Sequence, residues 1–238
     1  LGAQTYATLP GEACQKVDES LAPLSSYLGL LSMTTGLTAY FGIRDVGEVK
    51  AGETVVISAA AGAVGTVVGQ MAKIEGARVI GIAGGPAKCK FLTTEVGFDE
   101  AIDYKGESID ERLKELAPDG IDIFFDNVGG EMLDEVLEHI RERARVVICG
   151  AISQYDDNSN VYGPKKYLRL AERYARMEGF TVFHFMDRYP EAYATIGKWM
   201  AEGKIYMPEQ IEEGIEAFPN ALSMLFSGGN TGKLLVKF

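Results

Sequence analysis

The stretch ETVVISAAAGAVGTVVGQMAKIEGARVIGIAGG, residues 53–85, determines which fold this sequence predicts. It opens with a β-branched, apolar run at 54–58, which is typical of a parallel strand buried on both faces. A turn that contains glycines follows, and a second apolar run ends at Ala83. Between them the sequence predicts a helix whose apolar face can lie on a sheet, because apolar residues recur three and four positions apart. These residues are Val64, Val67, Val68, Met71 and Ile74.

The turn itself has the spacing of a dinucleotide fingerprint. Ala60, Gly62 and Gly65 occupy the three positions of the pattern G-x-G-x-x-G, with alanine departing from it at the first. In that pattern the second glycine lets the backbone approach a pyrophosphate, and the third lets the helix pack closely on the strand. A plain tight turn would fit the glycines alone. The flanking strands and helix favour a nucleotide site, with phosphates facing the free amides of the helix.

The end of the second strand indicates which dinucleotide is bound. NAD enzymes usually place Asp or Glu there to accept a hydrogen bond from the ribose 2'-hydroxyl. This chain has Ala83, Gly84 and Gly85 at that point, and Lys88 follows shortly after. An ammonium group attracts a 2'-phosphate that a carboxylate would repel, so the sequence predicts NADP(H). The alternative for Lys88 is an ordinary solvated lysine near a helix start.

Composition limits the classes of protein and of partner. The chain has 238 residues and 47% hydrophobic residues, enough for one large or two small domains with a sizeable core. Its net charge of −11 makes nucleic acid an unexpected partner. We expect no membrane span and no signal peptide, so the cytoplasm is the default compartment. Cys14, Cys89 and Cys149 are far apart and odd in number, which predicts free thiols.

Short apolar runs alternate with helical segments beyond the second strand. Strands are expected at 101–104, 121–126 and 145–150, with helices at 87–96, 108–117 and 130–141. This alternation predicts an α/β fold with a doubly wound parallel sheet. A sixth strand is expected over Gly179 to Phe185, and a helix precedes the first strand at 30–43. After Arg188 we expect helices at 190–205 and 216–230 and a final strand at 232–238.

Ligands of such sheets lie outside the carboxyl ends of the strands. Asn127 follows one strand and can bond ribose or adenine, or else cap a helix. Tyr104 can stack on adenosine or merely close its strand. The polar loop from Gln154 to Lys166 is either a lid on the substrate side or a plain surface connection. With only His139 and His184, both isolated, no metal site is expected, and neither a hydrolase elbow nor a P-loop occurs.

Taken together, these segments resemble a known family, the zinc-independent medium-chain dehydrogenases/reductases. The chain is most similar to their alkenal and prostaglandin reductase branch, whose fold combines a Rossmann domain with a GroES-like catalytic domain. The resemblance runs in order along nearly the whole chain. Its motifs are GLTAYFG at 36–42, AAAGAVGTVVGQ at 59–70, GGPAKC at 84–89, GFDEAIDYK at 97–105, FDNVGGE at 125–131, CGAISQY at 149–155, RMEGF at 176–180 and GNTGKLLVK at 229–237.

The resemblance implies an NADPH-dependent enzyme that reduces the C=C bond of α,β-unsaturated aldehydes and ketones. Hydride goes to the β-carbon, and Tyr155 is the candidate donor to the enolate oxygen, although a structural loop tyrosine is nearly as good an interpretation. A quinone reductase of the same superfamily, and a cofactor-binding module with little turnover, are the alternatives. The implied cofactor residues are Ala60, Ala61, Gly62, Ala63, Val64, Gly65, Lys88, Tyr104, Asn127, Cys149, Gly150, Ala151, Ile152, Ser153, Tyr155, Phe180, Thr181, Val182 and Asn230.

The resemblance also implies a division of the chain. Residues 1–30 correspond to the end of the catalytic domain, with its last strand-like segment near Gln4 to Thr8. Residues 31–187 form the NADP-binding domain, and 188–238 return to the catalytic domain, most of which is missing. Exposed apolar surface is therefore expected at both ends of the chain. Relatives suggest a homodimer.

Overall fold

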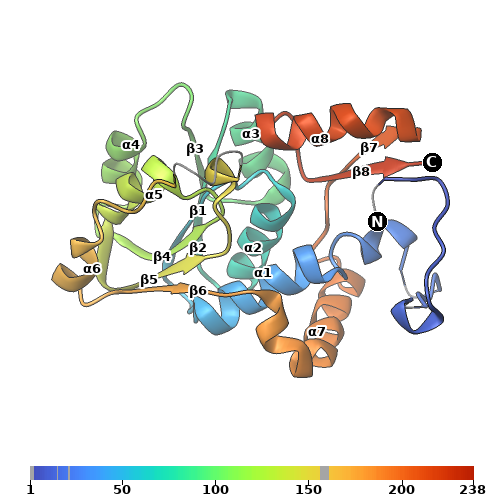
Figure 1. Ribbon diagram of the computed structural model, residues 1–238. Helices are drawn as coiled ribbons and strands as arrows, with labels where there is room; N and C mark the ends of the chain where they lie inside the picture. The colour runs from blue at the N-terminus through green and yellow to red at the C-terminus, as the bar shows by residue number, and fades with distance from the viewer. Residues whose placement is uncertain (1–2, 15, 21, 156–160) are drawn as a thin grey trace.

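The fold is known from a computed structural model, which describes residues 3–14, 16–20, 22–155 and 161–238 (Figure 1). Its centre is a six-stranded parallel sheet in the order β3-β2-β1-β4-β5-β6. The strands are β1 Thr54–Ile57, β2 Arg78–Ala83, β3 Glu100–Asp103, β4 Ile121–Asp126, β5 Ile140–Ile148 and β6 Arg176–Gly179. This is the strand order of a dinucleotide-binding sheet, whose direction of winding reverses between β1 and β4. The predicted doubly wound fold is confirmed.

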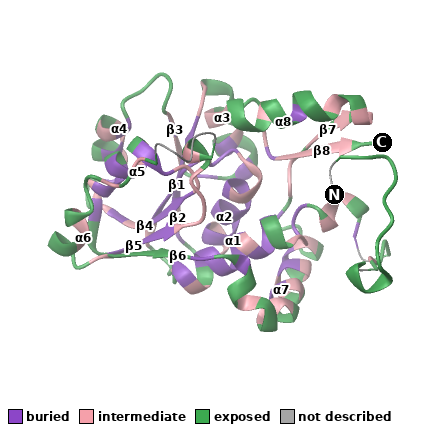
Figure 2. Ribbon diagram, viewed as in Figure 1, coloured by how far each residue is buried: buried purple, intermediate pink, exposed green. Residues whose placement is uncertain are grey.

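Helices cover both faces of the sheet, and each face has its own apolar core (Figure 2). One core lies against α2 Ala63–Ile74 and α1 Thr38–Phe41, where Val67, Met71 and Phe41 are fully buried. The other lies against α4 Ile109–Leu116 and α5 Gly130–Leu137. Side chains alternate along β1, so that Val55 and Ile57 enter the first core and Val56 enters the second. The apolar run at 54–58 is explained by this burial on both faces.

The helix expected at 30–43 is displaced and less regular. Helical backbone begins at Met33 and runs to Val46, with α1 between two π-helical segments, Met33–Leu37 and Gly42–Val46. Close packing explains the glycine within it: a Cβ on Gly36 would lie 1.7 Å from the carbonyl oxygen of Leu30. Two short helices, α3 Pro86–Phe91 and α6 Leu168–Glu172, precede β3 and β6.

The sheet has a sixth strand, but its predicted position, Gly179 to Phe185, is wrong. Strand β6 is Arg176–Gly179, and a 3-10 helical segment, Val182–Arg188, follows it. A capping interaction starts this segment, because Thr181 and His184 bond each other's backbone amides. Of the aromatic residues that suggested a strand, Phe185 packs from this segment and stacks on Phe41 at 4.6 Å between ring centroids, whereas Phe183 is exposed.

The last part of the chain forms a small parallel βαβ unit, here called the C-terminal unit. It consists of β7 Glu209–Glu213, α8 Phe218–Ser227 and β8 Lys233–Lys237, which pairs with β7 in parallel. The preceding helix, α7 Tyr189–Ala201, buries Ala192, Ile196 and Trp199 in the first core. In Figure 1 the C-terminal unit lies beside the six-stranded sheet, near the N-terminal segment.

Both ends of the chain expose apolar side chains, as expected. On α8 only Ala221 is buried, so most of this helix is exposed or intermediate in Figure 2. The strand-like segment near Gln4 to Thr8 is not a strand in the structure, and no described strand pairs with it. The exposed apolar residues in these two regions include Tyr6, Leu9, Leu24, Leu28, Ile211, Phe218, Leu222, Leu225, Phe226 and Phe238.

Candidate cofactor and active site

The glycine turn between β1 and α2 is built as the fingerprint predicts. Ala60 and Ala61 are buried, and Gly62 caps α2 with extended backbone. Ala63 and Val64 are half-buried in the first turn of the helix. No side chain of the described residues caps this helix end, so the amides of its first turn suit an anion.

The two glycines of the turn differ in the space around them. A Cβ on Gly65 would lie 2.5 Å from the carbonyl oxygen of Ala59 and 2.7 Å from Cα of Ala60, so only glycine lets the helix approach the turn this closely. A Cβ on Gly62 would meet only the oxygen of Ala59, at 3.2 Å. Ala60 fits at the first position because its methyl group packs against Gly81 of β2, which has no side chain. A Cβ on Gly81 would lie only 2.9 Å from the Cβ of Ala60.

A buried carboxylate joins the ends of β1 and β4 at the point where the winding reverses. Asp126 is fully buried and accepts hydrogen bonds from the hydroxyl of Ser58 at 2.8 Å and from the amides of Val128 and Gly129. Burial raises the pKa of Asp126, while the amide and hydroxyl donors oppose that rise. The sequence pattern gave no role to Ser58 or Asp126, although both stand at strand ends.

Asn127 belongs to the same group of contacts. Its backbone amide donates to the Ser58 hydroxyl and its side-chain amide donates to the Ser58 carbonyl, both at 2.8 Å. The interpretation as a helix cap is wrong, because Gly129 is the residue that caps α5. The side-chain oxygen of Asn127 has no hydrogen-bond donor among the described residues and can serve a ligand.

The tip of β2 is surrounded by cations and an aromatic ring. A Cβ on Gly84 would lie 2.9 Å from the Tyr104 ring and 3.0 Å from Cε of Lys105, so both side chains fold over this tip. Asp103, which stands nearby, is turned toward the backbone and accepts from the amides of Gly85 and Lys105. Lys105 was not among the predicted site residues, although it ends the motif GFDEAIDYK directly after β3.

Lys88 projects from α3 toward the C-terminal unit. Its ammonium donates to the carbonyl oxygens of Gly228 at 2.8 Å and Asn230 at 2.5 Å. Burial, and secondly the charge of Lys105, lower the pKa of Lys88. Neither lysine forms an ion pair with a carboxylate within the described part of the chain. The two cations therefore stand close to a strand tip with no acidic partner, which suits an anionic ligand.

The segment from Cys149 to Tyr155 lies beside the end of β4. The amides of Cys149 and Gly150 donate to the carbonyl of Asp126, and that of Ile152 donates to Asn127. Ala151 donates its amide to the Tyr155 hydroxyl at 3.1 Å, while Ser153 donates its hydroxyl to Val128. Tyr155 is 56% exposed, and its hydroxyl donates to no acceptor among the residues that the structure describes. Burial raises the pKa of the Cys149 thiol to about 12.

The remaining predicted residues come from more distant parts of the chain. The side chains of Phe180 and Val182 are buried in the first core. A ligand at this segment could therefore contact only their backbone and the exposed residue Thr181. Asn230 is buried and donates its side-chain amide to Gly232, whose own amide donates to the carbonyl of Ala61 at 2.8 Å. The C-terminal unit thereby reaches the glycine turn.

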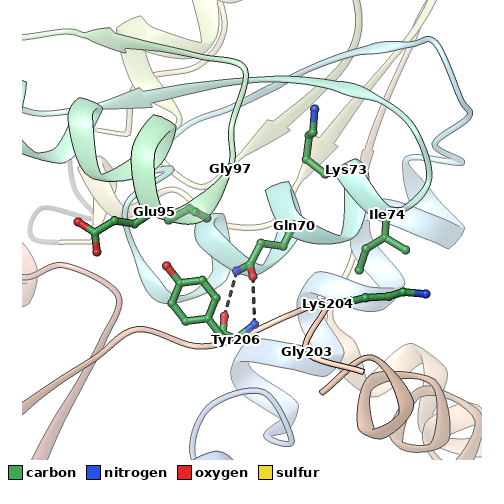
Figure 3. A pocket seen from close by; sticks show the side chains of 9 residues that line it. Gln70, Lys73, Ile74, Glu95, Gly97, Gly203, Lys204 and Tyr206 are labelled. Atoms are coloured by element: carbon green, nitrogen blue, oxygen red, sulfur yellow. Dashed lines mark hydrogen bonds between the residues drawn. The ribbon is translucent and has the colours of Figure 1, made fainter. Parts of the chain in front are cut away.

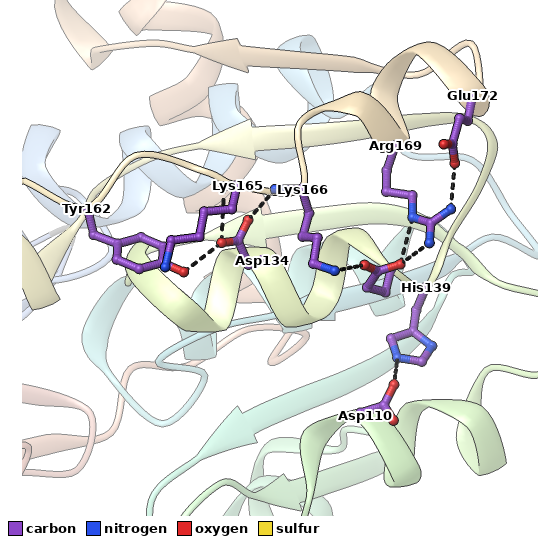
Figure 4. A network of polar contacts seen from close by, with 9 residues as sticks. Asp110, Asp134, His139, Tyr162, Lys165, Lys166, Arg169 and Glu172 are labelled. Carbon is purple, nitrogen blue, oxygen red and sulfur yellow. Dashed lines mark hydrogen bonds and ion pairs between the residues drawn. The ribbon is translucent and has the colours of Figure 1, made fainter.

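The loop that we considered as a lid is anchored where the structure describes it (Figure 4). Asp134 of α5 accepts from the Tyr162 hydroxyl and from the amides of Lys165 and Lys166. Gln154 accepts from the amide of Tyr162 at 2.7 Å, which joins the two ends of the loop. Residues 156–160 lie outside the described residues, so the lid itself stays a prediction.

A hollow of about 490 Å³ lies along the second half of α2, away from the glycine turn (Figure 3). Within it the buried side chain of Gln70 exchanges two hydrogen bonds with the backbone of Tyr206, at 2.9 and 3.0 Å. This contact attaches the segment before β7 to the cofactor helix. Among the described residues there is no cluster of potential ligands for a metal ion and no helix able to cross a membrane.

The chain matches known proteins along most of its length. A model of the family described as "Zinc-binding dehydrogenase" matches residues 63–201. A 2-alkenal reductase (NADP(+)-dependent) from Nicotiana tabacum is 43% identical over 99% of this chain and 68% of its own. Prostaglandin reductase 1 of Bos taurus is 42% identical over 99% of this chain and 73% of its own.

A solved structure shows the same fold. The chain superposes on CurA from Vibrio vulnificus, in complex with NADPH, with a TM-score of 0.84 and 43% identity. The match covers 90% of this chain but only 64% of that one, which is less than two thirds of its length. On these matches, the chain belongs to the medium-chain dehydrogenase/reductase superfamily, within its alkenal and prostaglandin reductase branch.

Proposed function

We propose that this chain carries the NADPH site and part of the active site of a reductase that saturates the C=C bond of α,β-unsaturated aldehydes and ketones. The observation that carries the cofactor assignment is the tip of β2, where two lysines stand without an ion pair to any described carboxylate. The carboxylate of Asp103 also lies there, but it is engaged by the backbone amides of Gly85 and Lys105. The NADP-dependent relatives support the same cofactor. The narrow space at Gly65 and the free amides of α2 suit a pyrophosphate held against the turn.

The residues divide into two groups along the proposed cofactor. Lys88, Lys105 and Tyr104 would hold the adenosine phosphate end, and residues 60–65 with Asn127 would hold the pyrophosphate and ribose. The segment 149–153, the backbone of residues 180–182 and Asn230 would complete the nicotinamide side. When bound, NADPH supplies the hydride that reaches the β-carbon of the substrate.

Tyr155 is the proposed substrate-side donor. Its hydroxyl oxygen accepts from Ala151, so its hydrogen can be donated to the carbonyl oxygen of the substrate as negative charge develops there. A proton taken from water at the α-carbon then completes the saturated product. Replacing Tyr155 by Phe should lower kcat by about 10- to 1000-fold with less effect on KM for NADPH.

A direct test measures NADPH oxidation by the purified chain with an alkenal, a cyclic enone and a quinone in parallel. Faster turnover of the alkenal or enone supports the proposal, and a preference for the quinone favours the quinone reductase alternative. Tight NADPH binding with no turnover of any acceptor would favour the cofactor-binding module. The chain spans only part of the length of its relatives, so the assay should also be run on the longest form of the protein that is expressed.

We also propose that the protein is a homodimer that pairs through β6. This strand is at the edge of the sheet, all its residues are exposed, and Tyr174, Met177 and Phe183 leave apolar surface beside it. Met177→Lys should give a monomer in analytical ultracentrifugation if this edge is the interface, and an unchanged dimer would refute it.

Because all three cysteines are free, a reducing compartment such as the cytoplasm is the proposed location.

The sequence predicts a cofactor domain over residues 31–187, but α7, which begins just beyond residue 187, packs Trp199 into the first core. We therefore propose that the domain begins near residue 31 and extends through α7. Limited proteolysis is the appropriate test, because cleavage should concentrate before residue 31 and between α7 and β7. Because Trp199 of α7 is buried in the first core, we expect α7 to remain in the same proteolytic fragment as the cofactor domain.

A further inference from the structure

The side chain of Gln70 holds the backbone of one residue, Tyr206, by both of its polar groups (Figure 3). The amide of Tyr206 donates to Gln70 Oε1 at 3.0 Å, and its carbonyl accepts from Gln70 Nε2 at 2.9 Å. The second hydrogen of Nε2 goes to the carbonyl of Thr66 at 3.1 Å, within α2. Because Gln70 is only 5% exposed and both hydrogens of its amide are used, it fixes Tyr206 in one place and one direction.

Tyr206 lies in residues 202–208, here called the connector, which leads from α7 to β7. Apart from Gln70, neither backbone group of Tyr206 has a hydrogen-bond partner among the described residues. The neighbouring Ile205 is buried in the first core, but apolar packing is non-directional and does not set the course of the backbone. Beside the contact, the hollow of about 490 Å³ lies between the connector and α2. The direction of the connector at this point therefore depends on Gln70.

The C-terminal unit also contacts the other end of the same helix. The amide of Gly232 donates to the carbonyl of Ala61, and Gly232 pairs as a parallel bridge with Gly62, the residue that caps α2. Gly62 and Gln70 are eight positions apart, which is about 12 Å along the helix. Two points on one helix fix the orientation of the unit, whereas a single point would leave it free to turn.

The two attachments are joined by closely packed main chain. Two residues after Tyr206, the carbonyl of Pro208 accepts from the amide of Lys233 at 2.8 Å. A Cβ on the adjacent Gly232 would lie 2.2 Å from that same carbonyl oxygen, so only glycine lets the two segments approach this closely. The other polar attachments of the unit among the described residues run through lysine side chains, which are long and flexible. A shift of the connector is therefore passed directly to Gly232.

We propose that Gln70 is a positioning residue: by holding Tyr206 it sets the orientation of the C-terminal unit against the glycine turn. The proposal rests on the proposed function, since this unit carries Asn230, which is assigned to the nicotinamide side. Without Gln70 the amides of α2 would still hold the phosphates, but Asn230 would no longer be fixed relative to the glycine turn. Gln70 should therefore affect turnover more than NADPH affinity, because a misplacement of about 1 Å caused far from the chemistry can cost about 100-fold in rate.

The experiment compares Gln70→Met with two matched variants, Lys73→Met and Tyr206→Ala. Methionine is about as long as glutamine but makes neither hydrogen bond. Lys73 lines the same hollow from the same helix, yet its ammonium pairs with Asp99 at 2.7 Å. Tyr206→Ala removes the ring and keeps the backbone groups that Gln70 holds. Hydrogen exchange of the Tyr206 and Gly232 amides is measured without cofactor, and NADPH affinity and the rate of enone reduction are measured separately.

The three variants have different expected results. In Gln70→Met, exchange should rise at least about tenfold at the Tyr206 amide and about 3- to 10-fold at the Gly232 amide. Its kcat should fall about 10- to 100-fold, while the Kd for NADPH changes by less than about threefold. Lys73→Met and Tyr206→Ala should behave as the wild type in all of these measurements.

Several results would overturn the proposal. Unchanged exchange at Gly232 in Gln70→Met would show that the contact acts only locally. Equal effects of Lys73→Met, or a loss of NADPH affinity as large as the loss of kcat, would refute a positioning role. If Gln70→Met does not fold, the wild type still provides a test, because exchange of its Tyr206 amide at the rate of an unfolded segment would show that the contact is not kept. A wild type that reduces no acceptor would instead refute the proposed function, while the exchange comparison would still stand.

Discussion

Replacing each glycine of the turn by alanine separates stability from cofactor binding. At Gly65 the added methyl group would lie 2.5 Å from the Ala59 oxygen and 2.7 Å from Cα of Ala60. An ordinary contact needs about 3.5 Å, and the obstructing atoms are backbone atoms that cannot rotate away. The turn or the helix must shift by roughly 1 Å, and such overpacking typically costs about 1–3 kcal/mol.

Gly62→Ala is the matched variant. Its added Cβ has a single neighbour at 3.2 Å, and its φ of −82° is accessible to alanine. As a helix cap, alanine is somewhat worse than glycine, so we expect a loss below about 1 kcal/mol. The new methyl group would, however, occupy the position where backbone approaches the pyrophosphate. NADPH affinity should fall about 10- to 100-fold, which corresponds to about 1.4–2.8 kcal/mol.

The two variants are distinguished by thermal unfolding and by NADPH titration monitored through cofactor fluorescence. For a chain of this size, about 1–3 kcal/mol lowers Tm by roughly 2–12 °C, so Gly65→Ala should unfold clearly earlier than Gly62→Ala. The reasoning is refuted if Gly65→Ala keeps the wild-type Tm. It is refuted equally if Gly62→Ala binds NADPH as tightly as the wild type.

Three further predictions concern residues around the site. Asp126→Ala leaves the Ser58 hydroxyl and two amides without their acceptor, so urea unfolding should show a loss of at least about 3 kcal/mol, against less than about 0.5 kcal/mol for the exposed Glu131→Ala. Since burial raises the pKa of Cys149 to about 12 and that of Cys89 to about 11, iodoacetamide at about pH 8 should label the exposed Cys14 first by mass spectrometry; rapid labelling of Cys149 would contradict its burial. Asp134→Ala removes the acceptor for Tyr162 and two amides, so hydrogen exchange at residues 162–166 should accelerate without a change in NADPH affinity.

The βαβ unit and the strands next to it could be predicted because their signals are local. Burial of β1 on both faces requires a continuous apolar run, and Gly65 is required by contacts with residues only five and six positions away. Lys105 could also have been predicted, because it follows β3 directly in the segment Asp103-Tyr104-Lys105, at the edge where ligands bind.

Other features have no local signal. Strand β7 reads Glu-Gln-Ile-Glu-Glu, with a single apolar residue, and it forms only because β8 pairs with it more than 20 residues later. The aromatic run after Gly179 has the composition of a strand, yet the core beneath it accepts Val182 and Phe185 from a helical segment, and Phe180 from just before that segment. The acceptors of Lys88 could not be inferred either, since they are main-chain carbonyls at the other end of the chain.

The C-terminal unit depends on the cofactor-binding elements for its position. Its own helix buries only Ala221, and neither of its strands has a fully buried residue, so its internal packing cannot fix its place. Four polar contacts hold this unit and the segment just before it: Gln70 to Tyr206, Lys88 to the carbonyls of Gly228 and Asn230, Ala61 to Gly232, and Lys233 to Thr35. Three of the four start from α2, α3 or the glycine turn. We therefore expect NADPH, by ordering these elements, to slow hydrogen exchange in β8 as well as at the glycine turn. Protection confined to the glycine turn would show that the C-terminal unit is held independently of the cofactor.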